Sequence, residues 1–554
     1  MSNLKHICFY PSSESFSAPV KDALARLVPV RFTDCPELLQ CKAADAVIDL
    51  SGDPKALDWF SKENVRCFHF GGECAEVRPN SGEARVRFGN SPNVDGCFRG
   101  RDIWHKPVER FCAVAVGKGD EVLARYGSEP VWVRRSGSDT AVDIVSVPAP
   151  KLREGERPFD YLDSYHFIQL LPLLHFLRTV TADIGWTAPP LRACLMFDDP
   201  NLHWTSYGFL SYREVISRAK RDRYHVSFAT VPLDAWGANS QAAELFRENP
   251  DQLSLLIHGN NHSKEELGQR RKPEENLALM ARSLRRIENL ELKTGLHVDR
   301  AIVPPHEALA DTALESILSL GVEGACLTPW SLKYWNKQRQ WSSSFGMELA
   351  EMVDDSFPVI ARFDLSGPWD GPVALSAFLG RPIVLFEHHE AVAAGIDLLS
   401  QAAATINSLG NVQWCSLQQM LRSNYLSRQE GATLQIKPYS SRIQFEIPAG
   451  ITSLAVVSSQ QGSGVGVRAW DLIRGHNGAK ASVRVIAGAS VTVTPGERVE
   501  LVSPVLGRVD YREVEPAGFP VRAFARRLIC ETRDRVLPLL PRKRGAGTAL
   551  RAAN

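Results

Sequence analysis

Two short apolar runs in the middle of the chain each end in polar residues that can carry chemistry. Residues 191–197 (LRACLMF) run into Asp198 and Asp199, and residues 253–257 (LSLLI) run into His258, with His262 four positions later. Apolar runs of this length, bounded by turn-forming residues, are typical of buried strands. In α/β folds the carboxyl ends of such strands form the ligand-binding edge. The pattern therefore predicts that these carboxylates and imidazoles meet at one edge of a sheet.

The same alternation of strand-like and helix-like patterns extends on both sides of these runs. Further strand candidates are 224–229, 301–303, 324–327, 383–386 and 412–415, and helical patterns cover 212–221, 241–247, 272–295, 312–320 and 394–409. The stretch between about 328 and 370 is rich in tryptophan and irregular. Repeated strand–helix units favour a barrel of alternating β and α elements. We predict one such domain over residues 186–430.

The flanking regions have different patterns. Residues 1–185 alternate short strands and helices and then become more β-like after 113, which predicts an amino-terminal α/β domain. A Gly-x-Gly-x-x-Gly dinucleotide fingerprint is absent, and the role of this domain is not legible from the sequence. Residues 431–515 contain short alternating runs separated by Gly and Pro, which predicts an all-β module of the sandwich type.

The last segment, residues 516–554, is a basic amphipathic tail. Its apolar residues recur near helical spacing, and its cations are Arg522, Arg526, Arg527, Arg533, Arg535, Arg542, Lys543, Arg544 and Arg551. A tail of this kind can lie on an anionic membrane surface. A helix that docks on the protein and continues into a disordered end fits the pattern equally well.

Composition narrows the class of protein further. The chain has 554 residues and a formal net charge of +1, so it has room for about three domains and no overall electrostatic reason to bind nucleic acid. Its 11 cysteines are scattered and never form Cys-x-x-Cys, which argues against a disulfide framework and for a reducing compartment. We see neither a signal peptide nor the roughly 18-residue apolar run that a membrane span needs. We therefore predict a cytoplasmic protein that is membrane-associated at most through its tail.

The polar residues at the strand ends suggest a metal site. One carboxylate and two imidazoles, here Asp199, His258 and His262, form a three-ligand set that leaves a position open on a divalent ion, most simply zinc. Asp198 would remain free to act as a general base. Such a centre activates water and polarises a carbonyl group.

The two motifs resemble those of the polysaccharide deacetylases, the NodB-homology domain of carbohydrate esterase family four, over roughly residues 186–430. That family has a Phe-Asp-Asp motif followed by His-Ser/Thr-x-x-His on a distorted (β/α) barrel, here matched by FDDPN and HGNNH. The resemblance implies Asp198 as catalytic base and Asp199, His258 and His262 as metal ligands. The family's Leu-x-x-His motif is matched by LFEH, which implies His388 as general acid.

The sequence also departs from the family's pattern. Pro200 and Gly259 replace the usual Gly and Ser/Thr, and the arginine that holds the base in the family is missing from VPPHE at 303–307. His306 is a candidate for its substitute. We also predict Trp204, Tyr207, His306 and His389 as substrate-binding residues, His389 being the rival of His388. Trp330, Trp335, Trp341 and Trp369 can form a sugar-stacking wall or pack in the core.

Together these features predict a metal-dependent hydrolase that removes an N-acyl group, most simply acetyl, from a sugar or polysaccharide precursor. Asp198 would take a proton from the attacking water, and protonated His388 would donate one to the departing amine. Two alternatives stay open. One is a non-catalytic carbohydrate-binding or assembly protein on a degenerate deacetylase barrel, and the other is an amidase with a non-sugar substrate.

Overall fold

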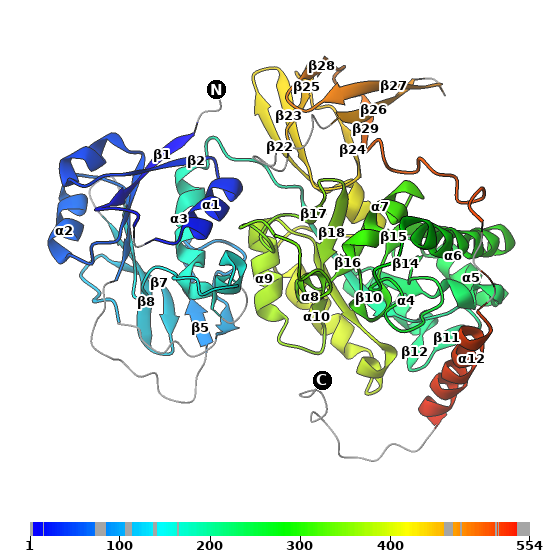
Figure 1. The fold of residues 1–554 in the computed structure, drawn as a ribbon. Coiled ribbons are helices and arrows are strands. Elements are labelled where there is room, and N and C mark those ends of the chain that lie inside the picture. Colours follow the sequence, from blue (N-terminus) through cyan, green and yellow to red (C-terminus); the bar gives the residue numbers. More distant parts are fainter. Residues whose placement is uncertain are drawn as a thin grey trace.

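The computed structural model describes residues 4–539, apart from residues 15, 72–84, 106–112, 137–140, 163–165, 459–468, 477–478, 516–517 and 519. The described part of the chain forms an amino-terminal α/β domain, a central α/β domain and a β module, followed by a helix against the central domain (Figure 1). The basic cluster at 542–544 lies outside the described residues. Within the described part, no helix is both long and apolar enough to cross a membrane.

The amino-terminal domain is built on a nine-stranded sheet of order β2-β1-β3-β4-β9-β8-β7-β5-β6. The pairs from β2 to β9 are parallel and those from β9 to β6 are antiparallel. The elements are β1 (Lys5–Tyr10), α1 (Ala18–Leu27), β2 (Val30–Asp34), β3 (Ala46–Asp49), α2 (Pro54–Lys62), β4 (Cys67–Phe70), β5 (Arg85–Phe88), β6 (Asp102–Trp104), β7 (Glu121–Tyr126), β8 (Glu129–Ser136), β9 (Ala141–Val145) and α3 (Leu171–Val180).

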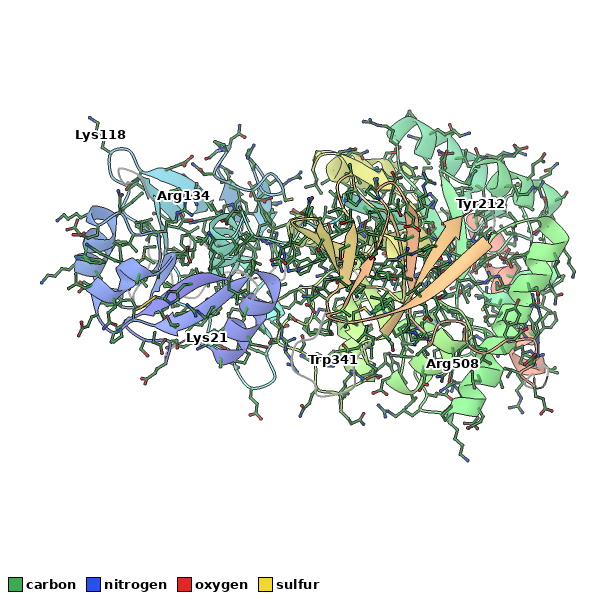
Figure 2. All side chains as sticks on the ribbon, turned by 90° about the horizontal axis from the view of Figure 1, so that it is seen from above. Lys21, Lys118, Arg134, Tyr212, Trp341 and Arg508 are labelled. Atoms are coloured by element: carbon green, nitrogen blue, oxygen red, sulfur yellow. A yellow bond between two sulfur atoms is a disulfide. The ribbon has the colours of Figure 1, made fainter. Side chains whose placement is uncertain are left out.

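This domain contains one disulfide and one largely buried ion pair. Cys8 and Cys35 form the disulfide, which the scattered cysteine pattern had not predicted. Arg134, labelled in Figure 2, donates two hydrogen bonds of 2.6 and 2.9 Å to the carboxylate of Asp143 on the neighbouring strand. Two adjacent strand positions of opposite charge thereby fix the register of β8 and β9.

The central domain contains a ten-stranded sheet. Its order is β17-β18-β16-β15-β14-β13-β10-β20-β19, and β21 pairs with β10 as a branch. All pairs are parallel except β17 with β18. The strands are β10 (Leu191–Asp198), β13 (Val226–Thr230), β14 (Leu253–Ile257), β15 (Val298–Ile302), β16 (Ala325–Leu327), β17 (Glu351–Val353), β18 (Phe357–Ala361), β19 (Phe363–Asp364), β20 (Ile383–Glu387) and β21 (Val412–Trp414). The predicted strands of this region are therefore present, and β17 to β19 were not predicted because their segment lacks periodicity.

Helices accompany these strands, and a two-stranded hairpin, β11 (Ser206–Tyr207) with β12 (Leu210–Ser211), follows β10. The helices are α4 (Tyr212–Asp222), α5 (Ser240–Glu248), α6 (Pro273–Thr294), α7 (Asp311–Ser319), α8 (Pro329–Trp335), α9 (Asp370–Leu379), α10 (Asp397–Asn407) and α11 (Leu417–Arg422). Local signals fix their ends. Ser211 caps α4 by accepting a hydrogen bond from the Glu214 amide, and Gly295 ends α6 with a positive φ of 67°.

The predicted barrel is not confirmed, because no closed ring of hydrogen-bonded strands is found among the described residues of the central sheet. β18 and β19 are nevertheless parts of one extended segment, interrupted only at Arg362. β18 pairs with β16, and β19 pairs with β20 at the other end of the sheet. One segment therefore links the two ends of the strand order, and Arg362 stands at the link.

The β module consists of two four-stranded sheets, of order β22-β23-β25-β28 and β24-β29-β26-β27. Their strands are β22 (Tyr425–Glu430), β23 (Thr433–Pro438), β24 (Arg442–Glu446), β25 (Ser453–Val456), β26 (Ala469–His476), β27 (Ala479–Ile486), β28 (Ser490–Thr492) and β29 (Arg498–Val502). Side chains from both sheets form one core cluster, as expected for a sandwich. β22 precedes the predicted start of this module at 431.

The amino-terminal and central domains share apolar packing. Leu375, Phe378 and Leu379 on α9 belong to the core cluster of the amino-terminal domain. At the same boundary Arg157 donates a 2.8 Å hydrogen bond to the backbone carbonyl of Trp341, which Figure 2 shows between the two domains. The apolar packing of α9 against the amino-terminal domain favours a fixed arrangement of the two domains.

Candidate metal centre

The predicted site residues come from three strands of the central sheet. Asp198 ends β10, His258 follows β14 and His388 follows β20. The order β14-β13-β10-β20 is parallel throughout, so the three carboxyl ends lie along one edge of the sheet. β10 is buried along nearly its whole length, as expected for a strand inside a parallel sheet.

Asp199, His258 and His262 form the only cluster of potential metal ligands found in the described part of the chain. One ligand atom from each lies within 4.8 Å of the others. The Oδ1 atom of Asp199 is 3.1 Å from His262 Nε2 and 3.8 Å from His258 Nε2. Both imidazoles are buried, while the Asp199 side chain is 19% exposed. The cluster is therefore closed on the side of the two imidazoles and partly open to solvent on the side of Asp199.

The donor set fits a divalent ion of the zinc type. Nδ1 of His258 lies 2.9 Å from the backbone carbonyl of Val303, which can only accept a hydrogen bond. Nδ1 therefore carries the proton, and the lone pair of Nε2 points towards Asp199. A second hydrogen bond that fixes the tautomer in this way is usual for metal-ligating histidines.

Burial keeps both histidines neutral, as metal ligands must be. It lowers the pKa of His258, and it lowers the pKa of His262 to about 3, although Asp199 acts in the opposite direction in both cases. Burial alone would raise the pKa of Asp199, but His262, Arg527 and His258 outweigh burial and hold it well below its usual range. One anionic and two neutral donors result, which is the charge state that binds a divalent cation.

Asp198 is held by Arg362, which sequence reasoning missed. The guanidinium donates two hydrogen bonds of 2.9 Å to the Asp198 carboxylate and one of 2.9 Å to Glu307. Burial by itself would raise the pKa of Asp198, but the charge of Arg362 outweighs burial and lowers it. The suggestion that His306 substitutes for the absent arginine is wrong, because Arg362 occupies that role. His306 is exposed, and its ring centre lies 4.9 Å from that of His262.

The two adjacent histidines after β20 point to different surroundings. His388 is 40% exposed, and its Nε2 lies 4.0 Å from Oδ2 of Asp199. His389 is buried, 5.2 Å from the Tyr207 ring, and 3.7 Å from the carboxylate of Asp534. Of these two histidines, His388 is therefore the one next to the ligand cluster.

The loop 258–262 is held in a strained shape by its surroundings. Gly259 and His262 have positive φ values of 66° and 51°, and Asp199 opposite them has 75°. The buried carboxylate of Glu266 accepts hydrogen bonds from the amides of residues 260 to 262, at 2.6 to 3.2 Å. Strain that the surroundings maintain is common at functional sites. Position 259 requires glycine, because a Cβ there would lie 2.6 Å from Pro305 Cγ.

The helix α12 (Val521–Val536) covers one side of the cluster. Arg527 is buried and lies 3.4 Å from Asp199, with a close bidentate ion pair to Asp234. Asp534 accepts a 2.9 Å hydrogen bond from the Tyr207 hydroxyl. Of the two predictions for the tail, docking on the protein is the arrangement present in this structure.

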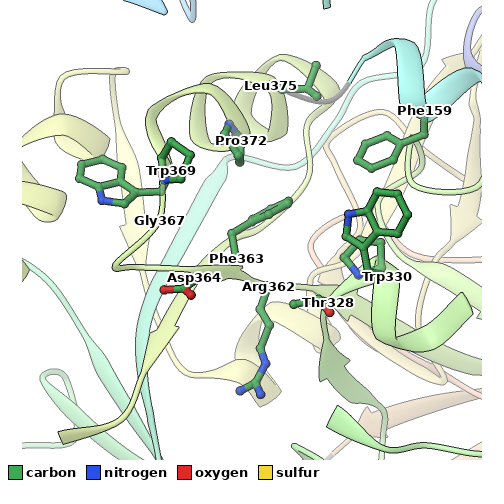
Figure 3. Close-up of a pocket in the computed structure, with 12 residues that line it drawn as sticks. Phe159, Thr328, Trp330, Arg362, Phe363, Asp364, Gly367, Trp369, Pro372 and Leu375 are labelled. Carbon is green, nitrogen blue, oxygen red and sulfur yellow. The ribbon is translucent and has the colours of Figure 1, made fainter. Parts of the chain in front are cut away.

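Other predicted substrate residues are dispersed. Tyr207 is buried, whereas Trp204 is 58% exposed with the Arg535 guanidinium 5.3 Å from its ring. Trp330 and Trp369 line one pocket of about 230 Å³ together with Phe363 (Figure 3). The remaining lining residues are Phe159, Thr328, Pro329, Arg362, Asp364, Gly367, Pro368, Pro372 and Leu375; Trp335 and Trp341 are not among them.

This pocket and the ligand cluster lie on opposite sides of one chain segment. In Figure 3 the Arg362 side chain points away from the aromatic rings, while Phe363 points towards them. Successive residues of a strand face opposite sides, so the segment 362–363 separates the pocket from Asp198. The aromatic pocket is a neighbour of the metal cluster and not a part of it.

Deacetylases and a carbohydrate esterase are among the solved structures to which the chain is similar. The chain is similar to the crystal structure of Agd3, described as a novel carbohydrate deacetylase, with 10% identity, a TM-score of 0.46, and coverage of 91% of this chain and 99% of that one. It is also similar to the family 4 carbohydrate esterase from Streptomyces lividans in complex with acetate, with 12% identity, a TM-score of 0.23, and coverage of 40% and 88%. The peptidoglycan deacetylase PdaC from Bacillus subtilis gives 13% identity, a TM-score of 0.24, and coverage of 42% and 91%.

No protein-family model matches the chain, and neither does any curated protein sequence. At the identities and TM-scores given above, the likeness does not assign a function. The assignment below therefore rests on side-chain geometry.

Proposed function

We propose that this protein is a metal-dependent hydrolase that removes an N-acyl group, most simply acetyl, from a carbohydrate. One observation carries the proposal. Three ligands of the right type converge within 4.8 Å, directly beside a carboxylate that a buried arginine keeps ionised. A catalytic metal centre of this class needs three protein ligands and an open position, with a base next to them.

Asp199, His258 and His262 would hold the ion. When bound, a zinc-like ion activates water and polarises a carbonyl oxygen. Asp198 takes up a proton at its carboxylate, and the two hydrogen bonds from Arg362 fix the orientation in which it does so. Arg362 is thus a positioning residue, and Glu307 in turn holds its Nε.

His388 supplies the acid. It lies on the opposite side of Asp199 from the buried His262, and it is exposed enough to exchange protons with water. An amine is a poor leaving group until it is protonated, so the reaction needs a donor that differs from the base. An imidazole whose ordinary pKa lies near neutrality suits that role.

The sugar nature of the substrate is proposed from the resemblance of the sequence motifs to those of the polysaccharide deacetylases. The aromatic pocket with Trp330, Trp369 and Phe363 lies across the segment 362–363 from Asp198, so its rings are not part of the support for a sugar at the metal cluster. The acyl group, the identity of the ion and a cytoplasmic location remain predictions of the sequence.

One contact favours a non-catalytic alternative. Arg527 places a cationic group 3.4 Å from Asp199, where it competes with a divalent ion for the same carboxylate. A carbohydrate-binding protein on a degenerate deacetylase domain would tolerate such a contact.

The deciding experiment combines metal analysis with turnover. We expect about one equivalent of divalent metal in the purified protein, or after adding back zinc, and its loss in Asp199→Ala and His262→Ala. Asp198→Asn is the matched control, because it should retain the metal and lose acetate release from N-acetylglucosamine oligomers. Absence of metal from the native protein after zinc addition contradicts the proposal. Bound metal without acetate release from sugars or simple amides favours the non-catalytic alternative.

A further inference from the structure

The face of the terminal helix α12 that contacts the protein is charged, and much of its apolar surface is exposed to solvent. Arg527, Glu531 and Asp534 recur at intervals of four and three residues, which places them on one face of the helix. All three contact the central domain. Arg527 pairs with Asp199 and Asp234. Glu531 accepts a hydrogen bond from Asn201, and Asp534 accepts one from Tyr207. A surface helix of a soluble protein normally has the opposite orientation.

The outer face of α12 carries an exposed apolar stripe. Val521, Leu528, Ile529 and Val536 recur at intervals of seven and eight residues, so they lie on one side. Their exposed fractions are 68%, 43%, 70% and 45%, and Leu539 just beyond the helix is 82% exposed. No element among the described residues buries this stripe.

Two exposed tryptophans extend the apolar surface beyond the helix. Trp204 is 58% exposed and packs against Arg535, and Trp236 is 56% exposed with its ring 6.2 Å from that of Phe524 on α12. Both follow strands of the central sheet, at the edge that carries the ligand cluster. Tryptophan is enriched at the boundary between water and lipid, where its ring is apolar and its N–H remains hydrated.

A row of arginines borders the stripe. Arg522, Arg526 and Arg533 are exposed, and their spacing of four and seven residues places them on the adjoining side of the helix. The sequence that follows adds Arg542, Lys543 and Arg544. Cations flanking an apolar stripe match a membrane surface, where acyl chains accept the apolar residues and anionic headgroups accept the arginines.

We propose that the outer face of α12, with Trp204 and Trp236, docks on an anionic lipid surface. The charge pattern selects this partner. A second copy of the chain would bring the arginine row close to itself in a two-fold interface, and a nucleic acid would leave the apolar stripe exposed to water. Docking in this way turns the edge that bears the metal cluster towards the lipid. The inference does not depend on the proposed hydrolase activity.

The test uses the full-length protein and sedimentation with vesicles of phosphatidylcholine alone or with about 30% phosphatidylserine. We expect binding to the anionic vesicles, little binding to the neutral ones, and weakening by salt. Replacing the three arginines by glutamine (R522Q, R526Q and R533Q) should weaken binding about a hundredfold, since each surface cation contributes roughly fivefold. Ile529→Glu should abolish binding.

Matched controls separate docking from general effects. Leu292→Glu alters an apolar side chain that is 78% exposed on α6, and Arg498→Gln removes an arginine whose side chain is 89% exposed on the β module. Both should bind vesicles as the native protein does.

Three results would overturn the inference. The first is equal binding to neutral and anionic vesicles. The second is an equal loss of binding in Leu292→Glu and Ile529→Glu. The third is a protein that does not bind vesicles but forms a dimer in solution, which Ile529→Glu dissociates. Tight, salt-sensitive binding to RNA or DNA without vesicle binding would likewise replace the lipid surface by a nucleic acid.

Discussion

Replacing Arg362 by methionine tests the central argument about the site. Arg362 is 1% exposed and bridges Asp198 and Glu307, which come from separate segments of the central domain. Methionine fills a similar space but has no charge, so Asp198→Asn and Glu307→Gln are needed as partners in double variants. Arg362→Lys is not a conservative control, because an ammonium cannot make the two parallel hydrogen bonds.

The expected cost follows from the burial of the pair. The Asp198 side chain is 4% exposed and that of Glu307 is 17% exposed, so removal of the arginine leaves one carboxylate fully and one mostly without water. Breaking a buried pair on one side costs about 3–5 kcal/mol of unfolding free energy. Adding Asp198→Asn should restore most of that loss, because the carboxamide that replaces the carboxylate carries no charge.

The same variant should change the pH dependence of activity. In the native protein Arg362 lowers the pKa of Asp198 against the effect of burial. Without Arg362, burial is opposed only by the smaller effects of His258 and His388, so the pKa of Asp198 rises from its native value. A base is active when deprotonated, so the acid limb of kcat/KM should move to higher pH in Arg362→Met.

Urea denaturation and pH–rate profiles measure these effects. The reasoning fails if Arg362→Met costs less than about 1 kcal/mol, if Asp198→Asn does not compensate for it, or if the acid limb stays in place.

Two further predictions concern the site loop and a buried histidine. Gly259→Ala should cost about 2–5 kcal/mol of unfolding free energy and weaken metal binding, because its φ is +66° and the new Cβ would lie 2.6 Å from Pro305. Denaturation and metal titration measure the two effects. Gly431→Ala is the control, because Gly431 has a φ of +60° but open space around it. Burial lowers the pKa of His225 to about 4 from 6.5. As pH falls below 6.5 the unfolded chain takes up a proton that folded His225 refuses, so stability should fall by up to about 3 kcal/mol by pH 4; His225→Gln should flatten that decline, and an unchanged slope would exclude this origin.

The sequence alone determined the strands that end at the candidate ligands and the residues at those ends. Apolar runs before Asp198 and His258 predicted β10 and β14, because a buried strand needs a continuous apolar run wherever it lies in the fold. The residue types at these strand ends and the resemblance of the motifs predicted that Asp199, His258 and His262 form one site, and the structure brings the three together.

The tertiary structure decided which partners complete the site. Arg362 lies 164 residues from Asp198 in the chain, within a segment that has no regular pattern. An arginine inside the apolar run VIARF was a signal that it is buried and paired, but the sequence did not name its partner. The pairing follows from the position of the segment that links the two ends of the central sheet.

The orientation of α12 was likewise beyond the sequence. Its pattern predicted an amphipathic helix and left open which face would meet the protein. The structure shows that the charged face does, because Asp199, Asp234 and Tyr207 together offer partners for Arg527 and Asp534. Periodicity along a chain fixes what a segment can bury, whereas ion pairs between distant segments depend on the positions to which the whole fold carries them.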